Sequence, residues 1–409
     1  MRLRRSVLTK PGVTRKRRGK GFAYYGPDGE RLTDADALQR IKDLVIPPAW
    51  KKVWIAPYAN GHIQAVGTDA AGRRQYLYHQ RWQEERAEEK FDRVLELSKE
   101  LPGWRERIAR DLAGRGLTRD RVLALGLHLL DLGYFRAGGE QYAEENESYG
   151  LATLLCEHVT LRRDAVAFDY PAKSGVQRQY EIENAEVVRA VRALLRRTDC
   201  NAGRFLVWRN GSEWVDVHSD DLNARFKELV GSDYSVKDLR TWHGTVLAAT
   251  AFADADPAVS QRVAKRVEAA VMREVSEELG NTPAVARSSY VDPRVVSGYR
   301  EGLTIAAAVR RAARADRPDV AQGVLEKATR DMIRRIAKGN RKTRFIGPGQ
   351  NGIVQRISLS GSYPESESGR DRKSAVERGS EYYGPGVRRF AAKEGSPVAT
   401  GGEISLPGP

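Results

Sequence analysis

The hydrophobic pattern changes from a strand-like to a helical period near residue 80, and this change constrains the fold more than any other feature. From residue 43 to about residue 78, apolar residues occur in short strand-like runs, VWIAPY, HIQAVGTD and QYLYH, separated by turn residues rich in Pro, Asn and Gly. From Arg81 onward, apolar residues recur every three or four positions, as they do on one face of a helix. The pattern predicts an α+β protein with a small β-rich N-terminal domain and a larger, mainly helical domain.

The helical period also predicts the internal organisation of the larger domain. Helices are expected at residues 82–100, 118–132, 148–159, 184–195, 219–230, 237–253 and 257–279. The segments AVAFDY and VQRQYEI are expected to form a hairpin joined by PAKSG, and RFLVW a third strand. Two further helical stretches lie at residues 304–315 and 318–337. We therefore expect a β-rich domain at residues 21–80, a helical domain at 81–303 and C-terminal helices at 304–338.

Basic residues are distributed unevenly over the 409 residues, which carry 69 Lys and Arg against 54 Asp and Glu, a formal charge of +15. Residues 1–20 hold nine basic and no acidic residues, which predicts a flexible arm suited to polyanions, or alternatively a solubilising tail. Residues 340–409 hold eleven basic and seven acidic residues and are rich in Gly, Ser and Pro, so 339–409 is expected to be a disordered tail. Residues 21–339 keep a net charge of only +2, so a nucleic-acid surface there requires uneven placement of charge.

Several classes of protein are disfavoured by the composition. No run approaches 18 apolar residues, and the basic N-terminus leads into no apolar stretch, so neither a membrane span nor a secretory signal is expected and the chain is predicted to be cytoplasmic. Cys156 and Cys200 are too few for a disulfide framework or a Cys-rich zinc site. The six histidines show no metal-ligand spacing. We therefore expect no metal ion and no cofactor.

Three short segments place a basic side chain at an unusual position, at the end of an apolar run, at a hairpin tip or within an apolar helix. Arg136 follows the apolar run LHLLDLGYF, and one interpretation is a structural ion pair with a nearby acid such as Glu140. Lys173 lies at the tip of the predicted hairpin, where most lysines are simply solvated. Arg240 lies in an apolar-periodic helix, where a buried guanidinium needs an acid or an anion. A structural carboxylate and a phosphate both remain open as that partner.

A fourth segment, LGNTPAVARSSYVDP, allows a geometric prediction. Gly280 is expected to end the long helix, Thr282 to cap the next one and Pro283 to occupy its first position. Asn281 then lies in a tight turn between helices. The helix break lets Asn281 and Tyr290 face one site, although a Tyr in this context is more often a packing residue.

Together these residues form a set suited to phosphoryl transfer. A tyrosine can attack a phosphodiester, two arginines can hold its nonbridging oxygens, and an amide can add a neutral hydrogen bond. A lysine can protonate the leaving oxygen. With two guanidinium groups supplying positive charge, this chemistry requires no metal ion.

From about residue 20 to residue 300, the ordered motifs resemble the type IB DNA topoisomerases of the compact bacterial and poxvirus-like branch. GYFRAGGEQYAEENESYGLATL resembles the family's first arginine segment, PAKSG its lysine hairpin, KDLRT its second-arginine helix and SYVDPRVV its nucleophile segment. The resemblance implies that the catalytic residues are Arg136, Lys173, Arg240, Asn281 and Tyr290. GRRQYLYHQRW resembles a DNA-facing strand, and the resemblance implies DNA contacts by Gln75, Tyr76, Tyr78, Tyr142 and Lys237.

The resemblance also implies a two-lobed clamp around double-stranded DNA, acting as a monomer on nucleoid DNA without ATP. Tyr290 would form a 3′-phosphotyrosyl link, Arg136 and Arg240 would stabilise the phosphorane, and Lys173 would act as general acid. Many members have a histidine where this chain has Asn281, and an amide can donate a hydrogen bond but carries no positive charge.

Two alternatives belong to other classes. A tyrosine recombinase shares an Arg, Lys, Arg, Tyr set, but recombinases usually show HxxR where this chain has Lys237 in KDLR, and they usually lack the GRRQYLYH lobe. A non-enzymatic basic DNA-binding protein would use Tyr290 structurally. It would bind DNA in a salt-sensitive way but form no covalent adduct.

Overall fold

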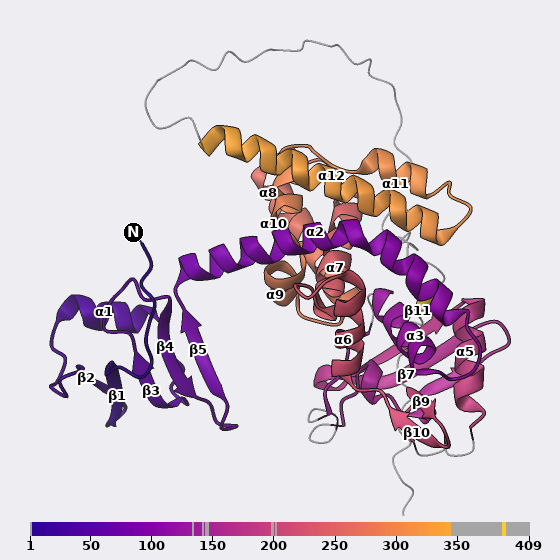
Figure 1. The fold of residues 1–409 in the computed structure, drawn as a ribbon. Helices are drawn as coiled ribbons and strands as arrows, with labels where there is room; N and C mark the ends of the chain where they lie inside the picture. Colours follow the sequence, from indigo (N-terminus) through magenta and orange to yellow (C-terminus); the bar gives the residue numbers. More distant parts are fainter. Residues whose placement is uncertain are drawn as a thin grey trace, which may run out of the picture. The chain divides into compact units, whose positions relative to one another are not determined.

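The computed structural model describes residues 2–132, 135–140, 143, 147–197, 200, 203–344 and 387–389, and of residues 174, 340–344 and 387–389 only the backbone. The chain forms two compact units, an N-terminal unit Met1–Arg93 and a C-terminal unit Val94–Pro409. Figure 1 shows a β-sheet unit and a mainly helical unit, which confirms the predicted α+β class. The boundary lies further along the chain than the predicted residue 80, because helix α2 (Gln80–Leu112) begins in one unit and ends in the other.

The N-terminal unit is built on a five-stranded antiparallel sheet with the order β2-β1-β3-β4-β5. Its elements are β1 (Val13–Arg18), β2 (Gly21–Tyr25), α1 (Ala35–Asp43), β3 (Lys51–Ile55), β4 (Ile63–Thr68) and β5 (Arg74–Tyr78). The three predicted strand runs are confirmed as β3, β4 and β5. The small core beneath the sheet is made by the buried side chains of Val13, Ile41, Ile46, Val53, Ile55 and Ala65.

The prediction that residues 1–20 form a flexible basic arm is wrong. Strand β1 lies inside the sheet, paired with β2 on one side and β3 on the other. Upstream of it, Ser6 Oγ donates to Ile63 O at 2.8 Å. Arg15 accounts for the error, because its guanidinium donates to backbone carbonyls, including Pro47 O at 2.9 Å, and its Cζ lies 4.1 Å from the centroid of the Phe22 ring. The run of basic residues therefore forms a strand, and Arg15 in this strand stabilises the fold.

The C-terminal unit is mainly helical. After the last turns of α2 it contains α3 (Arg119–Asp131), α5 (Ala185–Leu195), α6 (Ser219–Val230), α7 (Val236–Asp254), α8 (Gln261–Leu279), α9 (Pro283–Val285), α10 (Pro293–Arg300), α11 (Ala306–Ala312) and α12 (Pro318–Arg344). In the described part of the chain, none of the helices has the length and apolar character needed to cross a bilayer. Helices α11 and α12 confirm the two predicted C-terminal helices, and they pack on α7 and α10 as part of the same hydrophobic core.

The predicted hairpin is present as β7 (Val166–Ala172) and β8 (Val176–Ile182), joined by the short turn η3 (Lys173–Gly175). Strand β6 (Val159–Leu161) pairs with β7, and β11 (Val387–Arg389) pairs with β8. The predicted strand RFLVW forms in part as β9 (Val207–Asn210), but it pairs with β10 (Glu213–Asp216) in a separate sheet. Of the predicted tail, the structure describes the end of α12 and β11, and the rest lies outside the described residues.

The predicted helix at residues 148–159 is wrong. The segment forms two short 3-10 turns, η1 (Leu151–Thr153) and η2 (Cys156–His158), and then enters β6. Its amides bond to partners distant in sequence: Leu151 N donates to Arg136 O and Ala152 N to Ala137 O, each at 2.8 Å. These bonds replace helical ones, and they hold the segment against the loop that carries Arg136.

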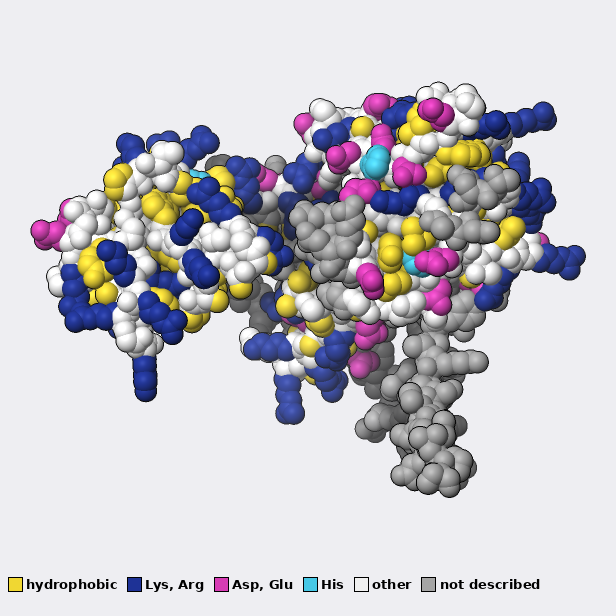
Figure 2. Space-filling model, turned by 90° about the horizontal axis from the view of Figure 1, so that it is seen from below, with side chains coloured by type: hydrophobic (Ala, Val, Ile, Leu, Met, Phe, Trp, Pro, Cys, Tyr) yellow, Lys and Arg dark blue, Asp and Glu magenta, His cyan; other side chains and the backbone are white. Residues whose placement is uncertain are grey.

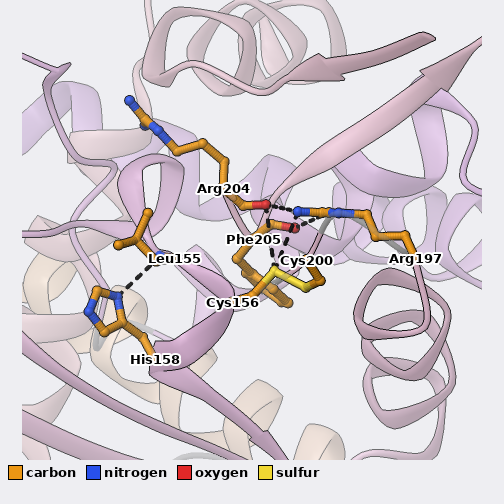
Figure 3. Close-up of a disulfide and its surroundings, with 7 residues drawn as sticks. All are labelled: Leu155, Cys156, His158, Arg197, Cys200, Arg204 and Phe205. Atoms are coloured by element: carbon orange, nitrogen blue, oxygen red, sulfur yellow. Dashed lines mark hydrogen bonds between the residues drawn. A yellow bond between two sulfur atoms is a disulfide. The ribbon is translucent and has the colours of Figure 1, made fainter. Parts of the chain in front are cut away.

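The two cysteines form a disulfide, which was not predicted from their number (Figure 3). The bond joins Cys156 and Cys200, 44 positions apart in sequence. The buried Arg197 lies beside it, with Nη2 3.4 Å from Cys156 Sγ and Nη1 donating to Phe205 O at 3.2 Å. The disulfide therefore ties η2 to the chain that leads into β9.

Candidate active site

The turn at the end of α8 is the centre of the candidate site. Gly280 adopts a left-handed conformation with φ +60°, which costs little only for a residue without a side chain. Asn281 N donates back to Ser276 O at 2.9 Å. Thr282 caps α9 by accepting from Val285 N at 3.3 Å, and Pro283 occupies the first position of α9. The helix break predicted from the sequence is confirmed.

Two predicted arginines meet at this turn. Arg136 Nη2 donates to Gly280 O at 2.5 Å from the loop that follows α3. Arg240, on α7, is 6% exposed, and it donates through Nη2 to Leu279 O and through Nη1 to Phe135 O at 3.3 Å. The carbonyls at the C-terminal end of a helix carry partial negative charge, so they suit cationic donors. The structure thus brings together two guanidinium groups that are 104 residues apart in sequence.

Tyr290 lies against this pair at the end of an unusual helical turn. Residues Ala286–Tyr290 form a π-helical segment, in which Val291 N donates to Ala286 O at 3.0 Å. Such turns are rare and frequently occur at functional sites. The Tyr290 side chain is largely buried, and Arg240 Cζ lies 5.5 Å from the centroid of its ring.

Helix α7 also holds the backbone of Tyr290. Thr245 Oγ1 lies 3.1 Å from Tyr290 O, to which it can donate, and it accepts from Asp292 N at 3.1 Å. Gly244 lies directly beneath, because a Cβ built on it would be 3.0 Å from Tyr290 Cβ. One turn of α7 therefore fixes the tyrosine while the preceding turn supplies Arg240.

The electrostatics of the site favour a bound anion. Burial raises the pKa of the Tyr290 phenol, but the positive charges of Arg240, Arg136 and Lys237 outweigh burial and leave the pKa below its ordinary value. Burial, followed by repulsion from Arg136, lowers the pKa of Arg240 to about 10. Both shifts show an excess of positive charge in a partly desolvated place, which a phosphate would relieve.

Asn281 adds an unsatisfied polar group. Both Nδ2 and Oδ1 of its side chain are buried, and neither has a hydrogen-bond partner within the described ranges. Buried polar atoms are nearly always paired in folded proteins, so such an amide calls for a ligand. It lies one residue after the carbonyl that receives Arg136.

The two predicted lysines lie at exposed positions. Lys237 is on α7, one turn before Arg240, and its charge acts on Tyr290. Lys173 lies in η3 at the tip of the β7–β8 hairpin. The structure thus gathers four of the five predicted catalytic residues at the end of α8 and places the fifth on a hairpin tip.

Comparisons with known proteins bear on the family of the chain. A family model described as the catalytic core of eukaryotic DNA topoisomerase I matches residues 79–313, more than half of the chain. A second, described as the N-terminal domain of bacterial DNA topoisomerase IB, matches residues 21–69. The chain belongs to the type IB DNA topoisomerase family. Members of this family are enzymes of the isomerase class, and the catalytic-core match spans every predicted catalytic residue.

Viral relatives cover most of the chain. The DNA topoisomerase 1B of Acanthamoeba polyphaga mimivirus is 30% identical over 285 residues, which is 68% of this chain and 85% of the relative. The DNA topoisomerase 1B of vaccinia virus (strain Copenhagen) is 23% identical over 299 residues, 68% of this chain and 90% of the relative. The type IB assignment therefore extends beyond the catalytic core.

In the N-terminal unit of this type IB protein, the predicted DNA contacts separate into two groups. Tyr76 and Tyr78 are 38% and 39% exposed on edge strand β5, with ring centroids 6.0 Å apart, and Arg74 Cζ lies 5.6 Å from the centroid of the Tyr76 ring. Gln75 points to the other face, where its Nε2 donates to Asp69 at 2.9 Å. Tyr142 lies outside the described residues.

Most of the excess positive charge belongs to the N-terminal unit. Residues 1–93 carry 20 Lys and Arg against 11 Asp and Glu, whereas residues 94–339 have a net charge of only +2. Figure 2 shows many Lys and Arg side chains on the face of the sheet unit that it presents, and few Asp and Glu. The charge therefore lies on a folded type IB N-terminal unit and not on a flexible arm.

Two contributors to the site were missed from the sequence. Thr245 was passed over because a threonine inside an apolar helix has no chemical signature. Arg178 on β8 is 5% exposed, and its Nη1 donates to Glu277 O at 3.1 Å. A signal for it existed, since strand alternation places Arg178 on the same side as the buried Tyr180, where a charge needs a reason.

Proposed function

We propose that this protein relaxes supercoiled duplex DNA by cutting and resealing one strand through Tyr290. The observation that carries the proposal is the pairing of a buried, acidified phenol with two guanidinium groups at one helix end. Lowering the pKa of a tyrosine prepares it as a nucleophile. The same cations would neutralise the phosphate that it attacks.

In the proposed reaction, the phenolic oxygen of Tyr290 attacks the phosphorus of a backbone phosphodiester. A bond forms between that oxygen and phosphorus, the bond to the 5′ oxygen breaks, and the phenol proton passes to water. The 5′ oxygen takes up a proton and leaves as a hydroxyl. The product is a 3′-phosphotyrosyl link, and because one phosphodiester replaces another, resealing by the reverse reaction needs no ATP.

The remaining residues have roles that follow from their chemistry. Arg136 and Arg240 would hold the nonbridging oxygens, and the buried amide of Asn281 would donate a further hydrogen bond. Lys173 would protonate the leaving 5′ oxygen and accept that proton again during resealing. Its position on a hairpin tip supports this role, because the turn can bring the ammonium to DNA bound at the site.

We further propose how the protein meets its substrate. The exposed row of Arg74, Tyr76 and Tyr78, together with Lys237, would contact duplex DNA. One chain contains all five candidate catalytic residues, so the proposed chemistry requires no second copy, and we propose that the protein acts as a monomer. The match to a bacterial N-terminal domain supports a bacterial source and action on nucleoid DNA in the cytoplasm. The disulfide stands against that location, because disulfides are uncommon in a reducing cytosol.

The proposal is tested by incubating the protein with supercoiled plasmid in EDTA without ATP. We expect relaxation of plasmids of unrelated sequence, and a protein-linked nick when detergent is added. Tyr290→Phe should abolish both results. Tyr299→Phe is a matched control, because Tyr299 is a buried tyrosine whose hydroxyl donates to Asp256 O at 2.6 Å. A nick that persists in Tyr290→Phe, or no nick with the wild type, would refute the proposal.

A further inference from the structure

Arg178 is a third guanidinium group at the end of α8. Besides donating to Glu277 O, it packs on the turn itself, since a Cβ built on Gly280 would lie 1.4 Å from Arg178 Nη2. Its Cζ lies 5.9 Å from the centroid of the Tyr180 ring. No carboxylate within the described ranges forms an ion pair with Arg178. Among the described residues a carbonyl and a ring are the contacts of this buried charge, and such a charge is costly, so it requires an explanation.

The charges of the three arginines act in one neighbourhood. The phenol of Tyr170 is buried, which raises its pKa, and Arg178, Arg240 and Arg136 all act on it in the opposite sense. Each guanidinium also donates to a different carbonyl of the same helix end. Two of these arginines have a proposed contact with the phosphate, whereas Arg178 donates to a carbonyl earlier in α8 than the other two and packs against Gly280.

We propose that Arg178 is a positioning residue that supplies positive charge behind the scissile phosphate and fixes the turn carrying Asn281. This inference rests on the proposed cleavage through Tyr290. The side chain of Asn281 is a neutral amide, so the turn itself contributes no charge to the phosphorane. Arg178 lies on the side of Gly280 where any other residue would carry its Cβ. From there its positive charge acts on the phosphorane across the turn.

The inference predicts a specific pattern of cleavage rates. Removing a direct donor to a developing oxyanion costs about 10²- to 10³-fold, so removing a charge one layer behind should cost about 10- to 100-fold. Arg178→Met removes both the charge and the hydrogen bond. Arg178→Gln keeps a donor near Glu277 O but loses the charge, and Arg178→Lys keeps the charge. We expect Met and Gln to slow single-turnover cleavage to a similar extent, and Lys to stay within about fivefold of the wild type.

A substrate without phosphate charge separates an electrostatic role from a structural one. A cleavage position is first mapped on a duplex with the wild type, and a methylphosphonate, which is uncharged, is then placed at that linkage. The positive charge of Arg178 has little to neutralise in this substrate. Arg178→Gln and Arg178→Met should therefore cleave it within about threefold of the wild type. An equal loss on both substrates would overturn the proposal, because it would indicate a purely structural role.

The controls distinguish this inference from the proposed function. Arg209→Met removes an exposed arginine on β9 and should cleave both substrates like the wild type. If the wild type forms no adduct with the ordinary duplex, the proposed function fails. If the wild type cleaves and Arg178→Gln cleaves the ordinary duplex as fast as Arg209→Met, only the role of Arg178 fails. Should Arg178→Met not fold, Arg178→Gln and Arg178→Lys alone carry the comparison.

Discussion

The hydroxyl group of Thr245 joins α7 to the tyrosine segment, and replacing it by Thr245→Val tests how the nucleophile is held. Valine has nearly the same shape as threonine, so the change removes hydrogen bonds without opening a cavity. Thr245 is 1% exposed. Its Oγ1 lies 3.1 Å from Tyr290 O, 2.9 Å from Thr241 O and 3.1 Å from Asp292 N. After the substitution, Asp292 N loses its acceptor and Tyr290 O loses a donor, both in a buried place.

The magnitude of the effect follows from these bonds. Leaving a buried donor or acceptor without a partner costs about 1–3 kcal/mol. Two such groups predict a loss of about 2–6 kcal/mol in the free energy of unfolding, before any relaxation. A displacement of the tyrosine by about 1 Å is enough to slow the chemical step about 10²-fold. Cleavage should therefore fall by about two orders of magnitude.

The assay compares single-turnover cleavage and urea unfolding for three variants. Thr245→Ser restores the hydroxyl and should recover cleavage to within about fivefold of the wild type. Thr250→Val is the matched control, because it removes a threonine hydroxyl from the same helix, one that donates to Val246 O at 3.1 Å. It should leave cleavage nearly unchanged. If Thr245→Val cleaves as fast as Thr250→Val, the idea that α7 positions the nucleophile is wrong.

Four further predictions follow from other parts of the structure. Because the pKa of Tyr290 is lowered, the cleavage rate should rise with pH and level off below the ordinary tyrosine value of about 10, and Arg240→Gln should move that rise to higher pH. Burial lowers the pKa of His128 and of His243, so the unfolded state takes up protons before the folded state does as pH falls below about 6.5. The urea midpoint should therefore fall between pH 7 and pH 5, and this fall should be smaller in His128→Gln. Reducing the disulfide, which closes a loop of 44 positions, should lower the free energy of unfolding by about 2–4 kcal/mol, measured by denaturation with and without reductant. Deleting residues 1–20 removes an interior strand, so circular dichroism should show the loss of β-sheet. The removal of a flexible arm would instead weaken the salt dependence of DNA binding and leave the spectrum unchanged.

The parts of the site that were predicted from the sequence obey local rules. Gly280, Thr282 and Pro283 mark a helix end and a helix start through backbone conformation alone, and the structure places all three as expected. The hairpin that carries Lys173 and the helix that carries Arg240 followed from apolar periodicity in the same way. Each of these features depends on neighbours within a few residues.

The features that were missed depend on contacts between distant segments. Strand β1 was hidden by its charges, because the structural role of Arg15 depends on contacts with the carbonyls near Pro47 and with the Phe22 ring. Residues 148–159 have a helical apolar pattern, but their amides bond to the loop of Arg136. Strand alternation marks Arg178 as buried, but its contact with Gly280, 102 positions away, is a tertiary one that the alternation does not give.

The identity of the residue that becomes linked to DNA tests the central claim most directly. The covalent complex formed with duplex DNA in EDTA is trapped with detergent, digested with nuclease and protease, and analysed by mass spectrometry. The account predicts a nucleotide attached through its 3′ phosphate to the peptide that contains Tyr290. A nucleotide on any other residue, or one attached through a 5′ phosphate, would contradict it.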